Sequence, residues 1–528
     1  MGYKRTRREF LSDAGKSAAL IALGAVSTAA NSDTLKTNQD KTYLNAAREF
    51  LDTLITKGTD RYGEKHTPLF CASLDPWMYS PRGIPTHVDW DYIREMEHLY
   101  RTYGYYWKLH LHGANLIYDM GTIRALYAMT DTTGSPKYSK AADDYLKFFL
   151  ENMVSPQTGM FGWGEHMAWN VFSDRLFGAT FQSAHIRNQF LGHELERWTT
   201  IYDVMWEKSP EKTLREIEAI YEFKIHDYGT FMFNRHSDYF AGRMTELIAF
   251  PKHAGLFAHA FAFLHAKTGE KKHLEWAVKM ADLFWRERNP QTNLVPGRLP
   301  IEDNLSGGNI TMLMALFMLR AYQWCPEQSL LDKSVAYIKG YRKYHLSESE
   351  NHIKHQINLD GTQNPNAKQP KAYGIGVTYA AKAAALAYSL SGDQDALDLA
   401  DFLVCAMSSG PIASGFIERS QVSDDVEMHG RLISTALDMY EITGDRKYLD
   451  YAKQWADKII EMSLHQGLFV SNVRFHTNKG IYISTGKVYD ARTGAGWLAL
   501  NLIRLQQLLD STAAGKFKKA DALDKIYD

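Results

Sequence analysis

The sequence is poor in cysteine, carries almost no net charge and has no long apolar segment. Three cysteines, Cys71, Cys325 and Cys405, are spread over 528 residues, which is neither a disulfide framework nor the spacing of a cysteine zinc site. Lys+Arg 60 against Asp+Glu 61 leaves no excess charge to attract nucleic acid. No apolar run is long enough for a permanent membrane-spanning helix.

Several functional motifs are also missing. The chain has no Walker loop, no dinucleotide fingerprint after a strand and no G-x-S-x-G nucleophile elbow. His110 with His112, and His253 with His259, do not have the spacing of a recognised metal motif. We therefore predict neither a metal ion nor a cofactor.

Aromatic residues, in contrast, are abundant. They make up 13% of the chain, with 12 Trp and 30 Tyr, in an otherwise ordinary globular composition. Such a content fits a large core, and it also fits carbohydrate binding, because the apolar faces of sugar rings stack on aromatic rings.

The N-terminus has the features of a targeting segment. It is basic, carries Arg7-Arg8 followed by Phe10-Leu11, continues as an apolar run over 18–26 and ends in small residues at Ala29-Ala30. This resembles a twin-arginine export signal. We predict a signal over residues 1–30, a single catalytic domain over 31–528, and a periplasmic or secreted protein.

Four segments of the chain repeat one pattern: 133–150, 268–285, 391–407 and 443–460. Each has a glycine near its start, then a polar turn, then an amphipathic stretch with alanine eight residues after the glycine. A glycine followed by a new 3.6-residue period is typical of the tight turn of a helical hairpin. Two further outer helices are predicted within 208–223 and 325–341.

The helix before each turn begins with glycine beside a polar residue. These starts are "HGAN" (112–115), "KHAG" (252–255), "SGGN" (306–309), "YGIG" (373–376), "MHGR" (428–431) and "RTGAG" (492–496). Another helix of this kind, without the glycines, is predicted at 183–198, and the helix near 43–56 is expected to close a ring. Hairpins repeating every 50–65 residues indicate an array or a closed ring.

This pattern resembles the α/α toroids of carbohydrate-active enzymes, the six-hairpin glycosidases and the related toroidal polysaccharide lyases. The resemblance implies an all-α fold, an (α/α)6 toroid of helical hairpins, with seven hairpins also allowed. A long open solenoid is the alternative. Likeness of fold does not fix the reaction.

The candidate site lies where the inner helices begin, because helix N-termini attract anions such as a carboxylated sugar. The substrate-binding candidates at these entrances are His112, Asn115, Trp163, His166, Asn170, Asn234, Arg235 and His253.

The stretch "MFGWGEHMAWN" (160–170) surrounds one carboxylate with aromatic rings. Trp163 and Trp169 are expected to form a wall on which sugars stack. Glu165 beside these rings would be partly desolvated, which raises its pKa toward general-acid work. The alternative is that the aromatic rings fill a gap between helices and Glu165 caps a turn.

The stretch "FNRHSDYF" (233–240) has the residue types that β-elimination from a uronate requires. Asn234 and Arg235 would neutralise the carboxylate, and His236 or Tyr239 would move the proton. The same residues would recognise a uronate in a hydrolase, so this stretch indicates the substrate class better than the reaction.

A hydrolase needs two carboxylates. We predict Glu165 as the acid, with Glu246 or Asp303 as its partner and Glu194 behind them. The resulting prediction is an exported, β-glucuronidase-like hydrolase of uronic-acid-containing poly- or oligosaccharides. The alternatives are a polysaccharide lyase on the same glycans, a non-catalytic glycan-binding toroid and, last, a sugar epimerase.

Overall fold

A computed structural model of the chain describes most residues beyond the N-terminal segment. They are residues 42–79, 113–164, 167–172, 174–178, 191–192, 195, 198–245, 247–347, 352–365, 375–408, 425–476 and 482–525. All of them except Thr42 belong to one compact unit, Tyr43–Asp528.

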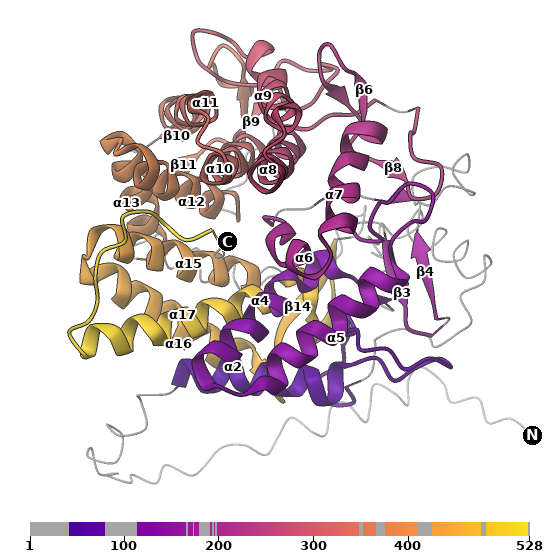
Figure 1. Ribbon diagram of the computed structural model, residues 1–528. Helices are drawn as coiled ribbons and strands as arrows, with labels where there is room; N and C mark the ends of the chain where they lie inside the picture. Colours follow the sequence, from indigo (N-terminus) through magenta and orange to yellow (C-terminus); the bar gives the residue numbers. More distant parts are fainter. Residues whose placement is uncertain are drawn as a thin grey trace, which may run out of the picture. The chain divides into compact units, whose positions relative to one another are not determined.

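Within the described residues, seven helices form the inner layer of a ring (Figure 1). They are α4 (Leu116–Thr133), α6 (Tyr202–Lys208), α8 (Pro251–Thr268), α10 (Gly308–Trp324), α12 (Ile375–Ser391), α15 (Asp425–Thr443) and α17 (Ala495–Ala513). Each helix from α6 to α17 packs against the next one, and α17 packs against α4. Arg124 of α4 donates hydrogen bonds of 2.7 and 3.1 Å to Asp203 of α6, which joins these two consecutive inner helices.

Seven outer helices surround this layer in the described part of the chain. Six of them follow an inner helix: α5 (Pro136–Asn152), α7 (Pro210–Ala219), α9 (Lys271–Arg286), α11 (Gln328–Gly340), α13 (Gln394–Ser408) and α16 (Arg446–Ser463). The seventh, α2 (Thr42–Thr53), lies between α16 and α5, because Tyr43 donates to Asp457 at 2.6 Å and Lys137 pairs with Asp52 at 2.8 Å. The α/α toroid is thus confirmed, and its described residues supply seven inner and seven outer helices.

The predicted glycine turns are present. Gly134, Gly269, Gly392 and Gly444 have φ angles of 70 to 73°, the left-handed conformation that glycine adopts at a helix C-cap. The alanines eight residues later, Ala142, Ala277, Ala400 and Ala452, are fully buried against the inner layer. The repeated pattern therefore corresponds to the turn and the packed face of each outer helix.

Glycine also permits the contact that closes the ring. A Cβ atom at Gly496 of α17 would lie 2.1 Å from the backbone nitrogen of Thr122 of α4, and one at Gly121 would lie 2.5 Å from that of Trp497. Only glycine allows the two helix backbones to approach this closely.

One predicted inner helix is wrong at Leu191–Gly192, and most of its predicted range, 183–198, lies outside the described residues. Leu191–Gly192 is strand β5, which pairs with β8 (Ser237–Asp238), and the inner helix at this place is α6 further along the chain. At these two residues, pairing with a strand distant in sequence replaces the helix that the local apolar period predicts.

Short strands occupy the connections that lead from an outer helix into the next inner helix. Besides β5 and β8 they are β1 (Ser73–Leu74), β2 (Gly113–Ala114), β3 (Met167–Asn170), β4 (Arg175–Gly178), β6 (Ile225–Asp227), β7 (Met232–Phe233), β9 (Leu305–Gly307), β10 (Leu346–Ser347), β11 (His352–Ile353), β12 (Gln356–Asn358), β13 (Leu464–His465), β14 (Leu468–His476) and β15 (Tyr482–Asp490). They form small antiparallel sheets, the largest in the order β1-β15-β14-β13. We call this side, where inner helices begin, the loop end, and the opposite side the turn end.

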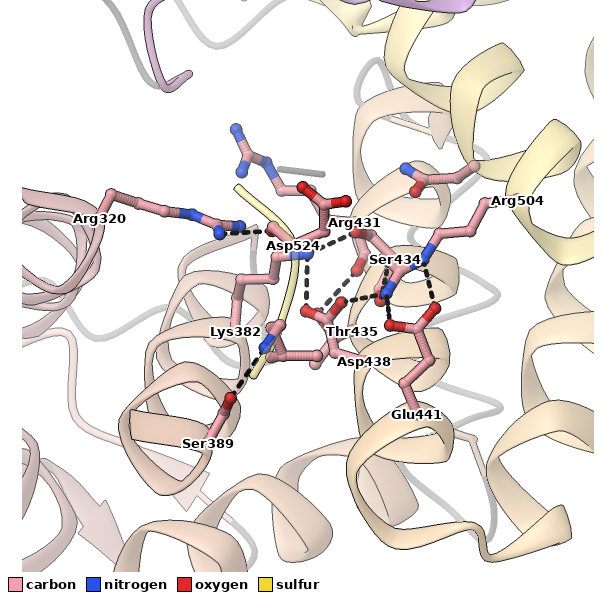
Figure 2. A network of polar contacts seen from close by, with 12 residues as sticks. Arg320, Lys382, Ser389, Arg431, Ser434, Thr435, Asp438, Glu441, Arg504 and Asp524 are labelled. Carbon is pink, nitrogen blue, oxygen red and sulfur yellow. Dashed lines mark hydrogen bonds and ion pairs between the residues drawn. The ribbon is translucent and has the colours of Figure 1, made fainter. Parts of the chain in front are cut away.

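Buried charges join the inner helices toward the turn end (Figure 2). Asp438 of α15 accepts from Lys382 of α12 at 2.7 Å and from Arg504 of α17 at 2.8 Å. Arg504 also contacts Glu441 at 2.8 Å, and Lys382 donates to Ser434 at 2.5 Å. The side chains of Asp438, Lys382 and Arg504 are at most 3% exposed, so their charges are compensated by one another rather than by water.

The C-terminal tail, residues 514–525, covers the turn end of the ring (Figure 1). Arg320 of α10 donates to the Asp524 carbonyl at 2.7 Å, and Ser389 of α12 accepts from the Leu523 amide at 2.9 Å, as Figure 2 shows. The Phe517 ring stacks on Tyr440 of α15 at 4.3 Å. The tail therefore ties together the ends of three consecutive inner helices.

Candidate active site at the loop end

The described site candidates all lie at the loop end. They are Asn115, Trp163, Asn170, Asn234, Arg235, His236, Tyr239, His253 and Asp303. The predicted catalytic residues Glu165 and Glu246, the predicted ligands His112 and His166, and the reserve carboxylate Glu194 lie outside the described residues.

Asn115 caps the first inner helix and organises the stretch that follows α5. Its side-chain oxygen accepts from the Ile117 amide at 3.1 Å, as an N-cap does. Its side-chain nitrogen donates to the carbonyls of Gly164 and Met167, both at 2.7 Å. These two residues flank Glu165 and His166 in the sequence. Asn115 is fully buried, so it holds this stretch in place instead of presenting its amide to a substrate.

Trp163 does not form a sugar-binding wall in this structure. Its ring is fully buried among Phe149, Phe161 and Tyr202, with centroid distances of 5.3 to 6.2 Å. Its indole nitrogen donates to Glu216 of α7 at 3.1 Å. The structure thus supports the alternative interpretation for Trp163, in which aromatic rings fill the gap between α5 and α7.

Asn170 is also engaged within the protein. It lies at the end of β3, opposite Gly113 and Arg175 in the β2-β3-β4 sheet, and its side-chain oxygen accepts from the Phe172 amide at 2.9 Å. Only 4% of the residue is exposed. Its described contacts shape the turn between β3 and β4.

The stretch containing Arg235 is tightly held by its backbone. The Asn234 side chain accepts from the His236 amide at 3.1 Å, and the buried Lys224 ammonium donates to the Arg235 carbonyl at 2.7 Å. The Arg235 amide donates to the Ile248 carbonyl at 2.9 Å. Of the run from Asn234 to Tyr239, only Arg235 is partly exposed. Its guanidinium lies 5.0 Å from the Phe250 ring centroid, a cation–π distance.

Tyr239 is a poor candidate for the base. It is 4% exposed and packs with Met160, Met167 and Ala219. Burial raises the pKa of Tyr239, and the nearby Glu216 carboxylate raises it further. A phenol with a raised pKa stays protonated at neutral pH, so it cannot accept a proton there, although it can donate one. His236 is buried as well, at 2% exposed.

The structure brings the two predicted stretches together. Thr158, just before the first, donates to the Tyr239 carbonyl at 2.7 Å, and the Ser237 hydroxyl lies 3.1 Å from the Met160 sulfur. Tyr239 also packs on both Met160 and Met167. The described residues of 160–170 thus pack with 233–240 as one unit at the loop end.

His253 and Asp303 lie outside this unit in different surroundings. His253 is fully buried in the first turn of α8, with its ring 6.0 and 6.3 Å from the rings of Phe250 and Phe257. Asp303 is exposed in the connection between α9 and α10, where it accepts a 3.4 Å hydrogen bond from the Leu305 amide. Neither position shows a feature that marks it as catalytic.

A buried group of side chains joins the starts of α12, α15 and α17 to the connection that leads into α6. We call it the floor cluster: Trp198, Tyr379, Glu427, Arg431 and Trp497, each at most 3% exposed. Its members come from distant parts of the chain, so no local pattern joins them.

Among the described residues, no group of three His, Cys, Asp or Glu side chains is arranged to hold a metal ion. None of the described helices combines the length and apolar character needed to cross a membrane.

Comparison with known proteins decides the family. The model of the periplasmic pectate lyase family matches residues 109–299 and 302–479. The chain belongs to this family. The match includes both stretches of the candidate site, 160–170 and 233–240.

Individual proteins similar to this pectate lyase family member share less than a quarter of its residues over the aligned parts. A pectate disaccharide-lyase from Dickeya dadantii is 23% identical over 203 residues, which cover 34% of this chain and only 36% of that enzyme. A family 76 glycoside hydrolase (mannosidase) from Bacteroides thetaiotaomicron superposes with a TM-score of 0.45 at 15% identity, over 89% of this chain and 99% of that one. An unsaturated glucuronyl hydrolase from Bacillus sp. GL1 gives a TM-score of 0.42 at 12% identity, over 76% and 98%.

Proposed function

We propose that the protein is an exported polysaccharide lyase that cleaves uronate-containing glycans of the pectate type by β-elimination. The observation that carries the proposal is the family match, which spans the packed unit formed by 160–170 and 233–240. The basic, twin-arginine-like start of the chain supports export.

The proposed reaction starts at Arg235. Arg235 is the partly exposed residue of its stretch, and its planar guanidinium pairs with the uronate carboxylate and stabilises the negative charge that develops when C5 loses its proton. The His236 imidazole takes that proton as the general base. The electrons of the C5–H bond form the C4=C5 double bond, the C4–O bond breaks, and the leaving oxygen takes up a proton from water.

Hydrolysis, the first expectation from the sequence, is the competing reaction. Its predicted acid Glu165 and partner Glu246 lie outside the described residues, and the described partner Asp303 is exposed in a separate connection. We rank elimination first because the family match favours it and Arg235 supplies the cation that it needs.

The deciding experiment measures two products in one assay. Purified protein, beginning near residue 31, is incubated with polygalacturonate and with glucuronate-containing glycans, with and without a chelator. New reducing ends and the ultraviolet absorbance of the conjugated C4=C5 bond are followed together. We expect both to rise in equal amounts. Reducing ends without absorbance would establish hydrolysis instead. Binding without either signal would indicate a non-catalytic glycan-binding ring.

A further inference from the structure

The floor cluster is built around one guanidinium. The Arg431 Cζ atom lies 3.5 Å from the Trp198 ring centroid and 4.5 Å from that of Tyr379. Its Nε atom is 3.3 Å from Glu427 Oε1, to which the Tyr379 hydroxyl also donates at 3.4 Å. Arg431 is thus held between two aromatic rings and by an ion pair.

Trp198 reaches this cluster from another part of the ring. It belongs to the connection that leads into α6, and in the inner layer α6 is followed by α4, α17 and only then α15. Its indole stacks on Trp497 of α17 at 5.2 Å with an interplanar angle of 16°. A Cβ atom at Gly494, which has φ +74°, would lie 2.8 Å from the indole, so the fit is close. The Trp198 side chain therefore lies against α15 and α17 instead of against its own helix.

The same connection touches the proposed catalytic stretch. Its strand β5 pairs with β8, in the register Leu191 to Asp238 and Gly192 to Ser237. Strand β8 directly follows Arg235 and His236 in the chain. One connection is thus attached at β5 to the catalytic stretch and at Trp198 to the floor cluster.

We propose that Arg431 is a positioning residue for the reaction: by holding Trp198 it fixes the connection whose β5 strand sets the place of Arg235 and His236. This inference rests on the proposed function for the identity of the reaction. Only arginine meets the requirement, since its flat guanidinium stacks on two rings while donating to a carboxylate. Lysine keeps the charge but cannot stack in this way.

The test compares three variants with a matched control. Arg431→Met removes the charge and keeps the length, and Arg431→Lys keeps the charge only. The double variant Arg431→Met/Glu427→Gln avoids leaving a buried carboxylate uncompensated. The control is Arg288→Met, because the Arg288 Cζ atom, in the separate connection between α9 and α10, likewise lies 3.6 Å from an indole ring centroid, that of Trp285.

We expect Arg431→Met to lower kcat about tenfold to a hundredfold with a smaller change in KM, since a displacement of about 1 Å at a catalytic group has this effect. Backbone amides of 232–242 should exchange hydrogen faster, while those of α8 stay protected. Arg431→Lys should recover part of kcat, and the double variant should recover thermal stability without kcat. Arg288→Met should change neither kcat nor the exchange of 232–242.

Two results would overturn the inference. If the double variant regains both stability and kcat, Arg431 is only a structural group. If exchange at 232–242 is unchanged in a folded Arg431→Met protein, the connection does not transmit its position. Failure of the proposed function has a different signature: the unaltered protein forms no unsaturated product, whereas the exchange experiment still reads out the link.

Discussion

The two ends of the ring use the same inner helices for different purposes. At the turn end each hairpin closes through a few residues, such as those at Gly134 and Gly444, and the C-terminal tail covers the centre. At the loop end the connections are long, contain every described strand and hold the proposed catalytic stretch. Short turns and the tail thus close one end, while the long connections of the other end have room for the proposed site.

The charged side chains at the two ends also differ in their surroundings. Burial alone would raise the pKa of Asp438 at the turn end, but the Lys382 and Arg504 cations hold it below its usual range. At the loop end, Arg431 and Glu427 form another buried pair, with both side chains 2% exposed, whereas Arg235 is a partly exposed residue. The described loop end thus holds a buried ion pair and also a partly exposed arginine in the proposed catalytic stretch.

The sharpest way to break the comparison is Asp438→Asn. It should lower the free energy of unfolding by about 3–5 kcal/mol, because Lys382 and Arg504 lose the carboxylate that compensates them. Thermal or denaturant unfolding measures this loss, and kcat of the remaining folded protein should be unchanged. Asp144→Asn, which removes an exposed i,i+4 pair with Lys140, is the control and should cost less than about 0.5 kcal/mol. A lost kcat would mean that the turn end also serves catalysis.

The corresponding variant at the loop end is Arg235→Ala, which should affect activity rather than stability. We expect kcat/KM for a polyuronate to fall about a hundredfold to a thousandfold, as for the loss of one transition-state contact to a developing charge. The melting temperature should stay near that of the unaltered protein, because the side chain is partly exposed. Arg243→Ala, an exposed arginine of the same connection, should leave kcat/KM unchanged. Equal losses in both variants would remove Arg235 from the proposed site.

A buried acid in the first turn of α4 predicts a pH dependence. Burial raises the pKa of Asp119 to about 7, against the opposing hydrogen bond from Tyr145. The folded state therefore holds a proton that the unfolded chain releases near pH 4, so this group's contribution to stability falls as pH rises from about 4 to 7. Asp119→Asn should remove this slope and raise stability above pH 7 by roughly 2–4 kcal/mol. Denaturant unfolding at several pH values measures it; an unchanged slope would contradict the prediction.

The tail offers a smaller test of the turn end. Leu523 is 3% exposed within the core, and Leu523→Ala should cost about 2–3 kcal/mol of unfolding free energy, as deletion of a buried leucine does. Asp521→Ala, exposed on the same tail, should cost almost nothing. Hydrogen exchange at the last turns of α10 and α12 should rise only in the first variant. If Leu523→Ala changed neither the unfolding free energy nor the hydrogen exchange, the tail would not stabilise the turn end of the ring.

The smallest effect is expected at Tyr239. Because its pKa is raised by burial and by Glu216, Tyr239→Phe should change kcat by less than about twofold. A bell-shaped pH profile that keeps both limbs in this variant would agree with that expectation. Loss of one limb would return Tyr239 to the list of proton-transfer groups and weaken the case for His236.

Much of the ring was predictable because its signals are local. A glycine such as Gly269 forces a turn, and an alanine such as Ala277 marks the face that packs, so both appear in the sequence at fixed spacing. The helix α6 was not predicted, because it has only seven residues and no glycine at its start. Pairs such as β5 and β8 depend on a partner far along the chain, which no local period reveals.

The site was less predictable, since the same residue types serve cores and clefts. Trp163 was expected to stack on a sugar and Tyr239 to transfer a proton, and both side chains are buried. That residues 160–170 and 233–240 pack together follows from tertiary contacts alone. Likewise Trp198 and Arg431 are joined only after the ring has formed.

The contact between α4 and α17 has a consequence for how the chain is made. The inner layer closes between a helix that begins at Leu116 and one that ends at Ala513, through the glycine crossing at Gly121 and Gly496. A nascent chain on the ribosome can stack its early hairpins as they emerge, but it remains an open arc until α17 is released. Among the described helices, α17 is the one that turns an arc of hairpins into a ring.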